Sequence, residues 1–163
     1  MPPIIPAVSG ASEQSSTNPE NKQRGRVLAL DVGSKRIGMA VSDELRLLAR
    51  GLETLSRQSK RLDLERIGQI AKELDVAEIV VGHPVRMGGE ASAQTVKVTS
   101  FAEELRAHCG LPVRLWDERL TSVEAEQVLG KRTVQRHIAD RKSGAADRLA
   151  AVLILQSYLD QQN

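Results

Sequence analysis

The stretch from residue 26 to residue 42 constrains the fold more than any other part of the chain. Two apolar runs, residues 26–32 and 36–42, are separated by a Gly-Ser-Lys turn, and this pattern predicts a β-hairpin. The first run carries a carboxylate, Asp31, two residues before Gly33. Burying an unpaired carboxylate costs roughly several kcal/mol. Asp31 therefore either begins a turn through its side chain, pairs with a cationic group or binds a metal ion.

Downstream of the hairpin, short apolar runs alternate with segments of helical periodicity. The predicted strands are residues 26–32, 36–42, 48–55, 77–81 and 112–116, and the predicted helices are residues 59–74, 91–108, 121–130 and 145–160. A capping box, Thr121 to Glu124, marks the start of the third helix. This order predicts an α/β domain with a mixed five-stranded sheet, in which three antiparallel strands precede α/β units, flanked by helices.

The first 24 residues differ from the rest in composition. Proline, serine, threonine and asparagine are frequent there, and apolar periodicity is absent. Such a segment cannot bury enough apolar surface to offset its ordering entropy, so we expect residues 1–24 to be a disordered tail and residues 25–163 to form the domain. The start lacks the basic residues and apolar core of a signal peptide, and no apolar run approaches the ~20 residues of a membrane span. We therefore expect a cytoplasmic protein.

Composition narrows the classes of function. The formal net charge is +2 and the sequence pI is about 8.9, which is compatible with a polyanionic partner. Only three residues are aromatic, which argues against a single-strand binder built on rows of stacking side chains. The single cysteine, Cys109, excludes a disulfide within the chain and a cysteine-based zinc cluster, and we expect it to be a buried, unreactive thiol.

Acidic residues lie at the ends of two predicted strands and open the last predicted helix. Asp31 ends the first strand, Asp117 and Glu118 follow the fifth, and Asp147 lies in the first helical turn. Because sites form where strand ends and loops meet, we expect these carboxylates to converge. An all-oxygen ligand set favours a hard ion, Mg²⁺ or Mn²⁺. Each acid also has a structural alternative: Glu118 could pair with Arg119, and Asp147 could stabilise the helix dipole.

Four motifs follow one another along the chain: ALDVGSKRIGMAVSD, IVVGHPVRMGG, DERLTSVEAEQVL and DRLAAVLILQSYL. Together they resemble the YqgF (RuvX) family, whose members are known as Holliday-junction-resolvase-like proteins or pre-16S rRNA nucleases, over residues 26–160. The resemblance implies an RNase H-like fold, and it matches Asp31, Glu118 and Asp147 to the family's catalytic acids. Asp117 is the weaker choice beside Glu118, because neighbouring side chains at a strand end point to opposite sides.

The loop after the fourth predicted strand departs from the family's pattern. Relatives often read Gly-Leu-Pro followed by Asn-Met-Asp-Gly, whereas this chain reads GHP at residues 82–84 and RMGG at residues 86–89. This loop offers no carboxylate, so it supplies no evident fourth metal ligand. We expect His83 to face solvent or to form a local hydrogen bond.

The acids and the resemblance together predict a metal-dependent endonuclease that hydrolyses phosphodiester bonds of structured nucleic acid. The substrate would be pre-16S rRNA, in 5′-end processing during ribosome biogenesis, or Holliday-junction-like DNA. Two divalent ions held ~3.5–4 Å apart would activate a water and stabilise the leaving 3′-oxygen. Asp31 would bridge both ions, with Glu118 and Asp147 each favouring one, and the products would carry 5′-phosphate and 3′-hydroxyl ends.

Basic residues near the acids are candidates for phosphate contacts. Segment 131–143 carries five basic residues and one acidic residue, and it is either a substrate clamp or a solvated loop. The candidate nucleic-acid-binding residues are Lys35, Arg36, Arg119, Arg132, Arg136 and Arg141.

Two other functions stay open from the sequence. Proteins of the actin and sugar-kinase type also carry an Asp-x-Gly phosphate loop, but they need two such domains, and ATP binding without nuclease activity would favour them. A ribosome-assembly factor could bind RNA with its acids idle, and retained RNA binding and cellular function after Asp31→Asn would favour that reading. We expect a monomer, since no extra apolar strip is left over.

Overall fold

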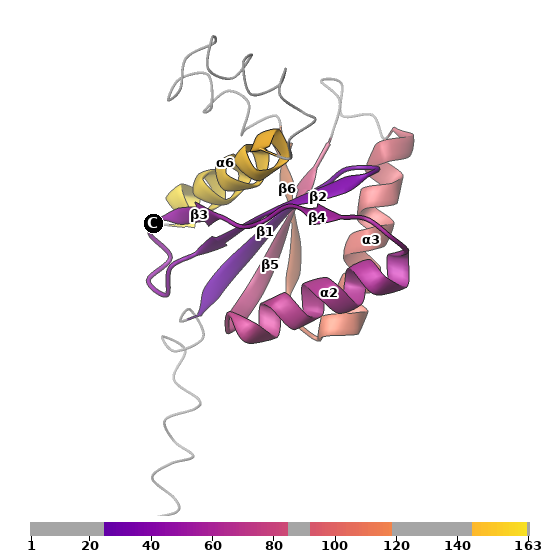
Figure 1. Cartoon of the computed structure of the whole chain (residues 1–163). Coiled ribbons are helices and arrows are strands. Elements are labelled where there is room, and N and C mark those ends of the chain that lie inside the picture. The colour runs from indigo at the N-terminus through magenta and orange to yellow at the C-terminus, as the bar shows by residue number, and fades with distance from the viewer. Residues whose placement is uncertain (1–24, 85–91, 119–144, 163) are drawn as a thin grey trace, which may run out of the picture.

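The computed structural model of the protein describes residues 25–84, 92–118 and 145–162. Within these ranges, one β-sheet has helices on both faces (Figure 1). The strands are β1 (Arg26–Val32), β2 (Arg36–Ser42), β3 (Ala49–Gly51), β4 (Leu55–Ser56), β5 (Val76–His83) and β6 (Val113–Asp117), and the helices are α2 (Lys60–Glu73), α3 (Ala93–Cys109) and α6 (Ala145–Gln162). The predicted tail 1–24, the predicted helix 121–130 and the basic segment 131–143 lie outside the described residues.

The sheet is mixed, as the sequence predicts. Its order is β3-β2-β1-β5-β6, with β4 also pairing to β2. β1 is antiparallel to β2 and parallel to β5, and β5 is parallel to β6. The β1–β2 turn is closed by the N–H of Gly33, which donates to the carbonyl oxygen of Arg36 at 2.9 Å. A Cβ atom at Gly33 would lie 2.8 Å from that oxygen, so the turn requires glycine.

The third predicted strand, residues 48–55, is wrong as a single element. It is split into β3 and β4, so the described sheet has six strands instead of five. Ala40 pairs with Gly51 and Ile37 pairs with Leu55, which sets two intervening residues of β2 against three on the other strand. The extra residue is a β-bulge, and a bulge of this kind interrupts the ladder.

Side chains of β1 alternate between two hydrophobic clusters. Leu28, Leu30 and Val32 belong to a cluster with residues of α2 and α3, whereas Val27 and Ala29 pack beneath α6. Figure 1 shows the same division, with α6 on one face of the sheet and α2 and α3 on the other. Each face is therefore covered, and functional groups are confined to the ends of the strands.

The helix boundaries follow local capping. The hydroxyl of Ser59 accepts from the N–H of Leu62 at the start of α2, and that of Ser92 accepts from Thr95 at the start of α3. Gly110, with φ +70°, ends α3 in the left-handed conformation. The predicted helices 59–74, 91–108 and 145–160 are thus confirmed within two residues at each end. Among the residues placed by the structure, no helix is long and apolar enough to cross a membrane.

A candidate three-carboxylate site

Asp31 and Glu118 lie together at one edge of the sheet. β1, β5 and β6 run parallel, so the end of β1 and the residue after β6 reach the same edge. The two side chains are hydrogen-bonded to each other, which requires a proton on one of them. Burial, the negative charge of Asp31 and the hydrogen bond to it, and the charge of Asp117 raise the pKa of Glu118 to about 7. The pair therefore holds a proton up to about neutral pH.

Gly82 of β5 leaves the space that the Glu118 carboxylate occupies. A Cβ atom at Gly82 would lie 2.6 Å from Oε1 of Glu118 and 2.6 Å from Cδ1 of Ile154 on α6. Because Cβ atoms essentially never approach so closely, any side chain at this position would displace the carboxylate of Glu118 and the end of the Ile154 side chain. Gly82 thus places Glu118 on the face of the sheet that α6 covers.

Asp147 reaches the same edge because α6 lies directly on β2. A Cβ atom at Gly38 would lie 2.0 Å from the backbone oxygen of Asp147 and 3.1 Å from its Cβ. Gly38 is the cross-strand partner of Asp31, and neighbouring strands are about 4.8 Å apart. The structure therefore brings Asp31, Glu118 and Asp147 to one edge and one face of the sheet.

The Asp147 carboxylate is only partly compensated. Nε of Arg36 lies 3.2 Å from Oδ2 of Asp147, an ion pair between half-buried side chains. Oδ2 is nevertheless buried and accepts no hydrogen bond from the described part of the chain, so the pair lacks hydrogen-bond alignment. A buried acceptor without a hydrogen bond costs about 1–3 kcal/mol. This oxygen is consequently suited to a ligand that brings positive charge.

The donor set fits a hard divalent cation in its chemistry. It combines three carboxylates, an oxygen of Asp147 without a hydrogen bond from the described residues, and an Asp31–Glu118 pair that shares a proton. In the ranges that the structure covers, no group of three or more His, Cys, Asp or Glu residues is placed closely enough to hold a metal ion. The carboxylates are suitable ligands for Mg²⁺ or Mn²⁺ in their chemistry. In this structure, however, they are farther apart than the ligands of a bound metal ion.

Gly38 offers a direct test of how Asp147 is positioned. We expect Gly38→Ala to lower the free energy of unfolding by about 1–3 kcal/mol, because its Cβ would meet the α6 backbone. Gly51→Ala is the matched control, since the closest atoms to its Cβ would belong to the flexible side chain of Arg148. Urea unfolding of both variants measures the difference. Equal losses would show that α6 does not depend on the close approach at Gly38.

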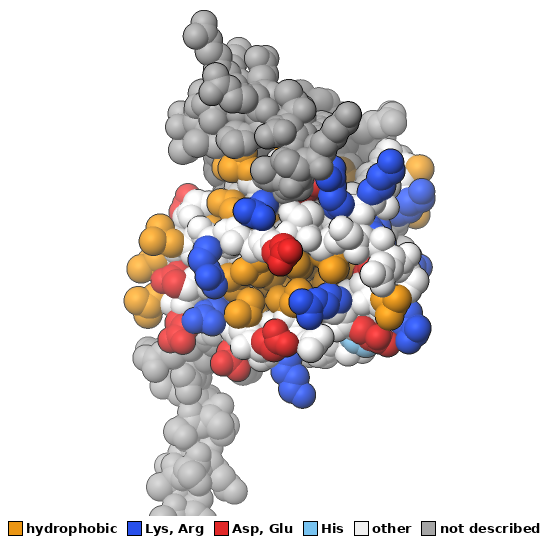
Figure 2. All heavy atoms as spheres, viewed as in Figure 1, with side chains coloured by type: hydrophobic (Ala, Val, Ile, Leu, Met, Phe, Trp, Pro, Cys, Tyr) orange, Lys and Arg blue, Asp and Glu red, His pale blue; other side chains and the backbone are white. Residues whose placement is uncertain are grey.

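The predicted basic residues are only partly visible. Lys35 is exposed in the β1–β2 turn, whereas Arg36 faces Asp147. The remaining candidates, Arg119, Arg132, Arg136 and Arg141, lie outside the described residues. Figure 2 shows a surface on which acidic and basic side chains are largely mixed, and basic side chains gather at the right of the view, over the β1–β2 turn and the start of α3.

His83, at the end of β5, contacts a residue of α3 that is 16 positions away along the chain. Its Nε2 lies 3.3 Å from Oγ1 of Thr99 on α3, within hydrogen-bond distance. The ring is therefore held against α3, on the opposite side of the sheet from α6.

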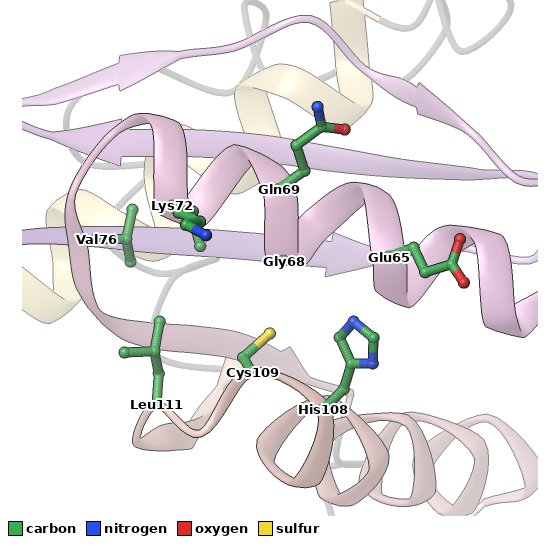
Figure 3. A pocket seen from close by; sticks show the side chains of 9 residues that line it. Glu65, Gly68, Gln69, Lys72, Val76, His108, Cys109 and Leu111 are labelled. Carbon is green, nitrogen blue, oxygen red and sulfur yellow. The ribbon is translucent and has the colours of Figure 1, made fainter.

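A cavity of about 480 Å³ lies at the far end of the sheet, between the last turns of α2 and α3 (Figure 3). Lys72, His108 and Cys109 line it, and Figure 3 shows the Cys109 thiol directed toward the helix α2 side of the cavity. Cys109 is half-buried, where a buried thiol was expected, and burial raises its pKa, which keeps it protonated and unreactive. This cavity is remote from the three carboxylates.

Sequence reasoning missed the two glycines that position the site. Gly38 and Gly82 both lie on the α6 face, next to small or apolar residues of the same strands such as Ala40. Small residues at alternating positions of β2 were the signal that a helix approaches this face closely.

Comparison with known proteins places these features in context. A family model with the description "RuvX: Holliday junction resolvase" matches residues 25–161. A Koribacter versatilis protein named "Putative pre-16S rRNA nuclease" is 48% identical over 139 residues, which are 85% of this chain and 88% of that protein. A Thermoanaerobacter pseudethanolicus protein of the same name is 49% identical over 138 residues, 84% of this chain and 97% of that protein.

The fold also resembles a solved structure of low sequence identity. The structure described as "T. thermophilus RuvC in complex with Holliday junction substrate" superposes with a TM-score of 0.51 at 16% identity, and covers 84% of this chain and 96% of that chain. A second Thermus thermophilus RuvC structure gives the same TM-score at 18% identity. At these identities the likeness concerns the fold alone.

Proposed function

Because this chain belongs to the RuvX family, we propose that it is a metal-dependent endonuclease that hydrolyses phosphodiester bonds of structured nucleic acid. The fold is RNase H-like and is shared with RuvC. One observation carries the proposal. Asp31 and Glu118 share a proton, and Asp147 lies over Gly38, the cross-strand neighbour of Asp31. The buried Oδ2 of Asp147 accepts no hydrogen bond from the described residues. Carboxylates gathered at one edge of a sheet repel one another, and bound positive charge offsets that repulsion.

In this proposal Asp31, Glu118 and Asp147 would together hold divalent ions. When bound, such ions polarise the phosphate and acidify an attacking water. With a cation held beside it, Glu118 would release its proton to water, because the cation would offset the repulsion from Asp31 that helps to raise the pKa of Glu118. Arg36 holds the Asp147 carboxylate at the edge of the sheet. The products would carry 5′-phosphate and 3′-hydroxyl ends.

We further propose a precursor of 16S rRNA as the substrate. The names of the two bacterial relatives support RNA, whereas the RuvC structure was solved with a Holliday junction, which is the substrate of that protein. Lys35 and the basic residues Arg119, Arg132, Arg136 and Arg141 would contact phosphates around the cleaved bond. Cytoplasmic location and a monomeric state stay predictions.

The test presents the purified protein with two substrates, a labelled RNA that spans the 5′ boundary of 16S rRNA and a four-way DNA junction. Each is incubated with Mg²⁺, with Mn²⁺ and with EDTA, and the product ends are mapped. We expect the RNA to be cleaved only when a divalent ion is present. Cleavage confined to the junction would reassign the substrate to DNA, and RNA binding without cleavage would favour a non-catalytic assembly factor.

A further inference from the structure

A second cavity opens at the same sheet edge as the carboxylates, but on the face covered by α2 and α3. Its volume is about 460 Å³. Its walls include Ser34 of the β1–β2 turn, Arg57 just before α2, Lys60 at the start of α2, and Gln94 and Lys97 of α3. We call this cavity the β1–α3 groove. In Figure 2, basic side chains gather over the β1–β2 turn and the start of α3.

The lining of the β1–α3 groove is basic. It contains three basic residues and no acidic residue. Arg57 is paired with Asp63, and Lys60 is paired with Glu104. Lys97 is exposed and forms no ion pair with any residue that the structure describes. The groove therefore presents a net positive charge, and Lys97 supplies most of it.

The walls of the groove are fixed before any ligand binds. Nη1 of Arg57 donates to the carbonyl oxygen of Gly33 at 2.9 Å, and the guanidinium lies 5.4 Å from the centre of the Phe101 ring. The side chain of Gln94 donates to the carbonyl oxygen of Val32 at 3.2 Å. These contacts tie the β1–β2 turn to α2 and α3. A rigid wall lowers the entropy that binding costs.

β1 connects the groove to the carboxylates. Asp31 faces the α6 side, whereas the next residue, Val32, faces the opposite side and lines the groove. The groove starts one or two residues beyond Asp31, and two residues of a strand advance about 7 Å. One flexible strand of nucleic acid could therefore contact both places across the end of the sheet.

We propose that the β1–α3 groove binds the sugar–phosphate backbone of a single strand that leads away from the three-carboxylate site. This rests on the proposed function, because the strand is a part of the substrate to be cleaved. The volume matches pockets that hold one small ligand, about 300–1,000 Å³, and so suits a nucleotide unit. The groove offers cationic and amide donors, so it would hold phosphates and carry little sequence preference.

The test compares Lys97→Gln with Lys72→Gln, which removes the same charge from the far cavity of Figure 3. Binding of a fluorescent single strand, as RNA and as DNA of one sequence, is measured in EDTA over a range of salt concentrations. We expect Lys97→Gln to reduce the slope of log affinity against log salt by about 0.7 in both polymers. Lys72→Gln should leave the slope unchanged.

The outcomes separate this proposal from the proposed function. A wild-type slope for Lys97→Gln, or equal changes of slope in the two variants, would show that the groove does not bind the strand, even if the protein cleaves RNA. A slope that depends on Lys97 in a protein that cleaves nothing would support the groove and refute the nuclease. If Lys97→Gln changed the salt dependence of duplex binding but not of single-strand binding, the proposal that the groove binds a single strand would also be wrong.

Discussion

Replacing Asp31 with asparagine is expected to reduce single-turnover cleavage at saturating substrate by about 10³-fold. In the proposed site Asp31 would hold divalent ions, which would supply several kcal/mol of stabilisation to the charge that develops at the phosphate, and each ~1.4 kcal/mol corresponds to a factor of ten in rate. Folding should survive, because asparagine has the same shape and its amide can donate the hydrogen bond that Glu118 now shares with Asp31. The measurement is a rapid-mixing time course with labelled precursor RNA.

Asp160→Asn is the matched control for this variant. It makes the same chemical change on the exposed end of α6, far along the helix from Asp147, and should cleave at the wild-type rate. Wild-type cleavage by Asp31→Asn would remove that residue from the proposed site. Loss of cleavage together with a lower melting temperature would instead indicate that Asp31 supports folding.

Replacing Glu118 with glutamine is expected to change how stability depends on pH. The folded-state pKa of Glu118 is raised from 4.5 to about 7, chiefly by burial and by Asp31. Between these values the folded chain holds a proton that the unfolded chain has released, so stability falls as pH rises from 4.5 to 7. The contribution is complete below pH 4.5 and lost above 7. In EDTA at about pH 8, Glu118→Gln should therefore raise the free energy of unfolding by up to about 3 kcal/mol.

Urea unfolding of both proteins from about pH 4 to about pH 8 measures this effect. The two should have similar stability at the acidic end and diverge as the pH increases. Glu53→Gln, which changes an exposed side chain, should show the same dependence of the free energy of unfolding on pH as wild type. If wild type and Glu118→Gln kept parallel profiles, Glu118 would not lie in the crowded, buried position described.

Most of the fold follows from hydrophobic periodicity, because burial decides which residues form strands and helices. The continuous apolar run within residues 26–32 predicts β1, and the spacing of Leu64, Ile67 and Ala71 predicts α2. The break between β3 and β4 could not be predicted in this way. A bulge depends on the register of two strands, and the residues around Gly51 look the same whether or not one of them is unpaired.

The candidate site was predictable as a set of positions but not as a set of contacts. Strand ends and a helix start indicate that Asp31, Glu118 and Asp147 converge. The pairing of Arg36 with Asp147 joins residues more than 100 positions apart, so it requires the three-dimensional arrangement of α6 on β2. From the sequence, only the proximity of Arg36 to Asp31 is evident, so Arg36 was predicted as a phosphate contact, and that role stays a prediction.

β1 also determines where this protein can change in length. Consecutive residues of the strand, Asp31 and Val32, belong to opposite sides of the sheet. One inserted or deleted residue before Asp31 would turn the carboxylate into the apolar cluster beneath α2 and α3 and withdraw Val32 from the groove. The outer strand already carries an extra residue between β3 and β4, where the ladder reforms on both sides. Insertions should accumulate there in natural and engineered variants, and β1 should keep a constant length.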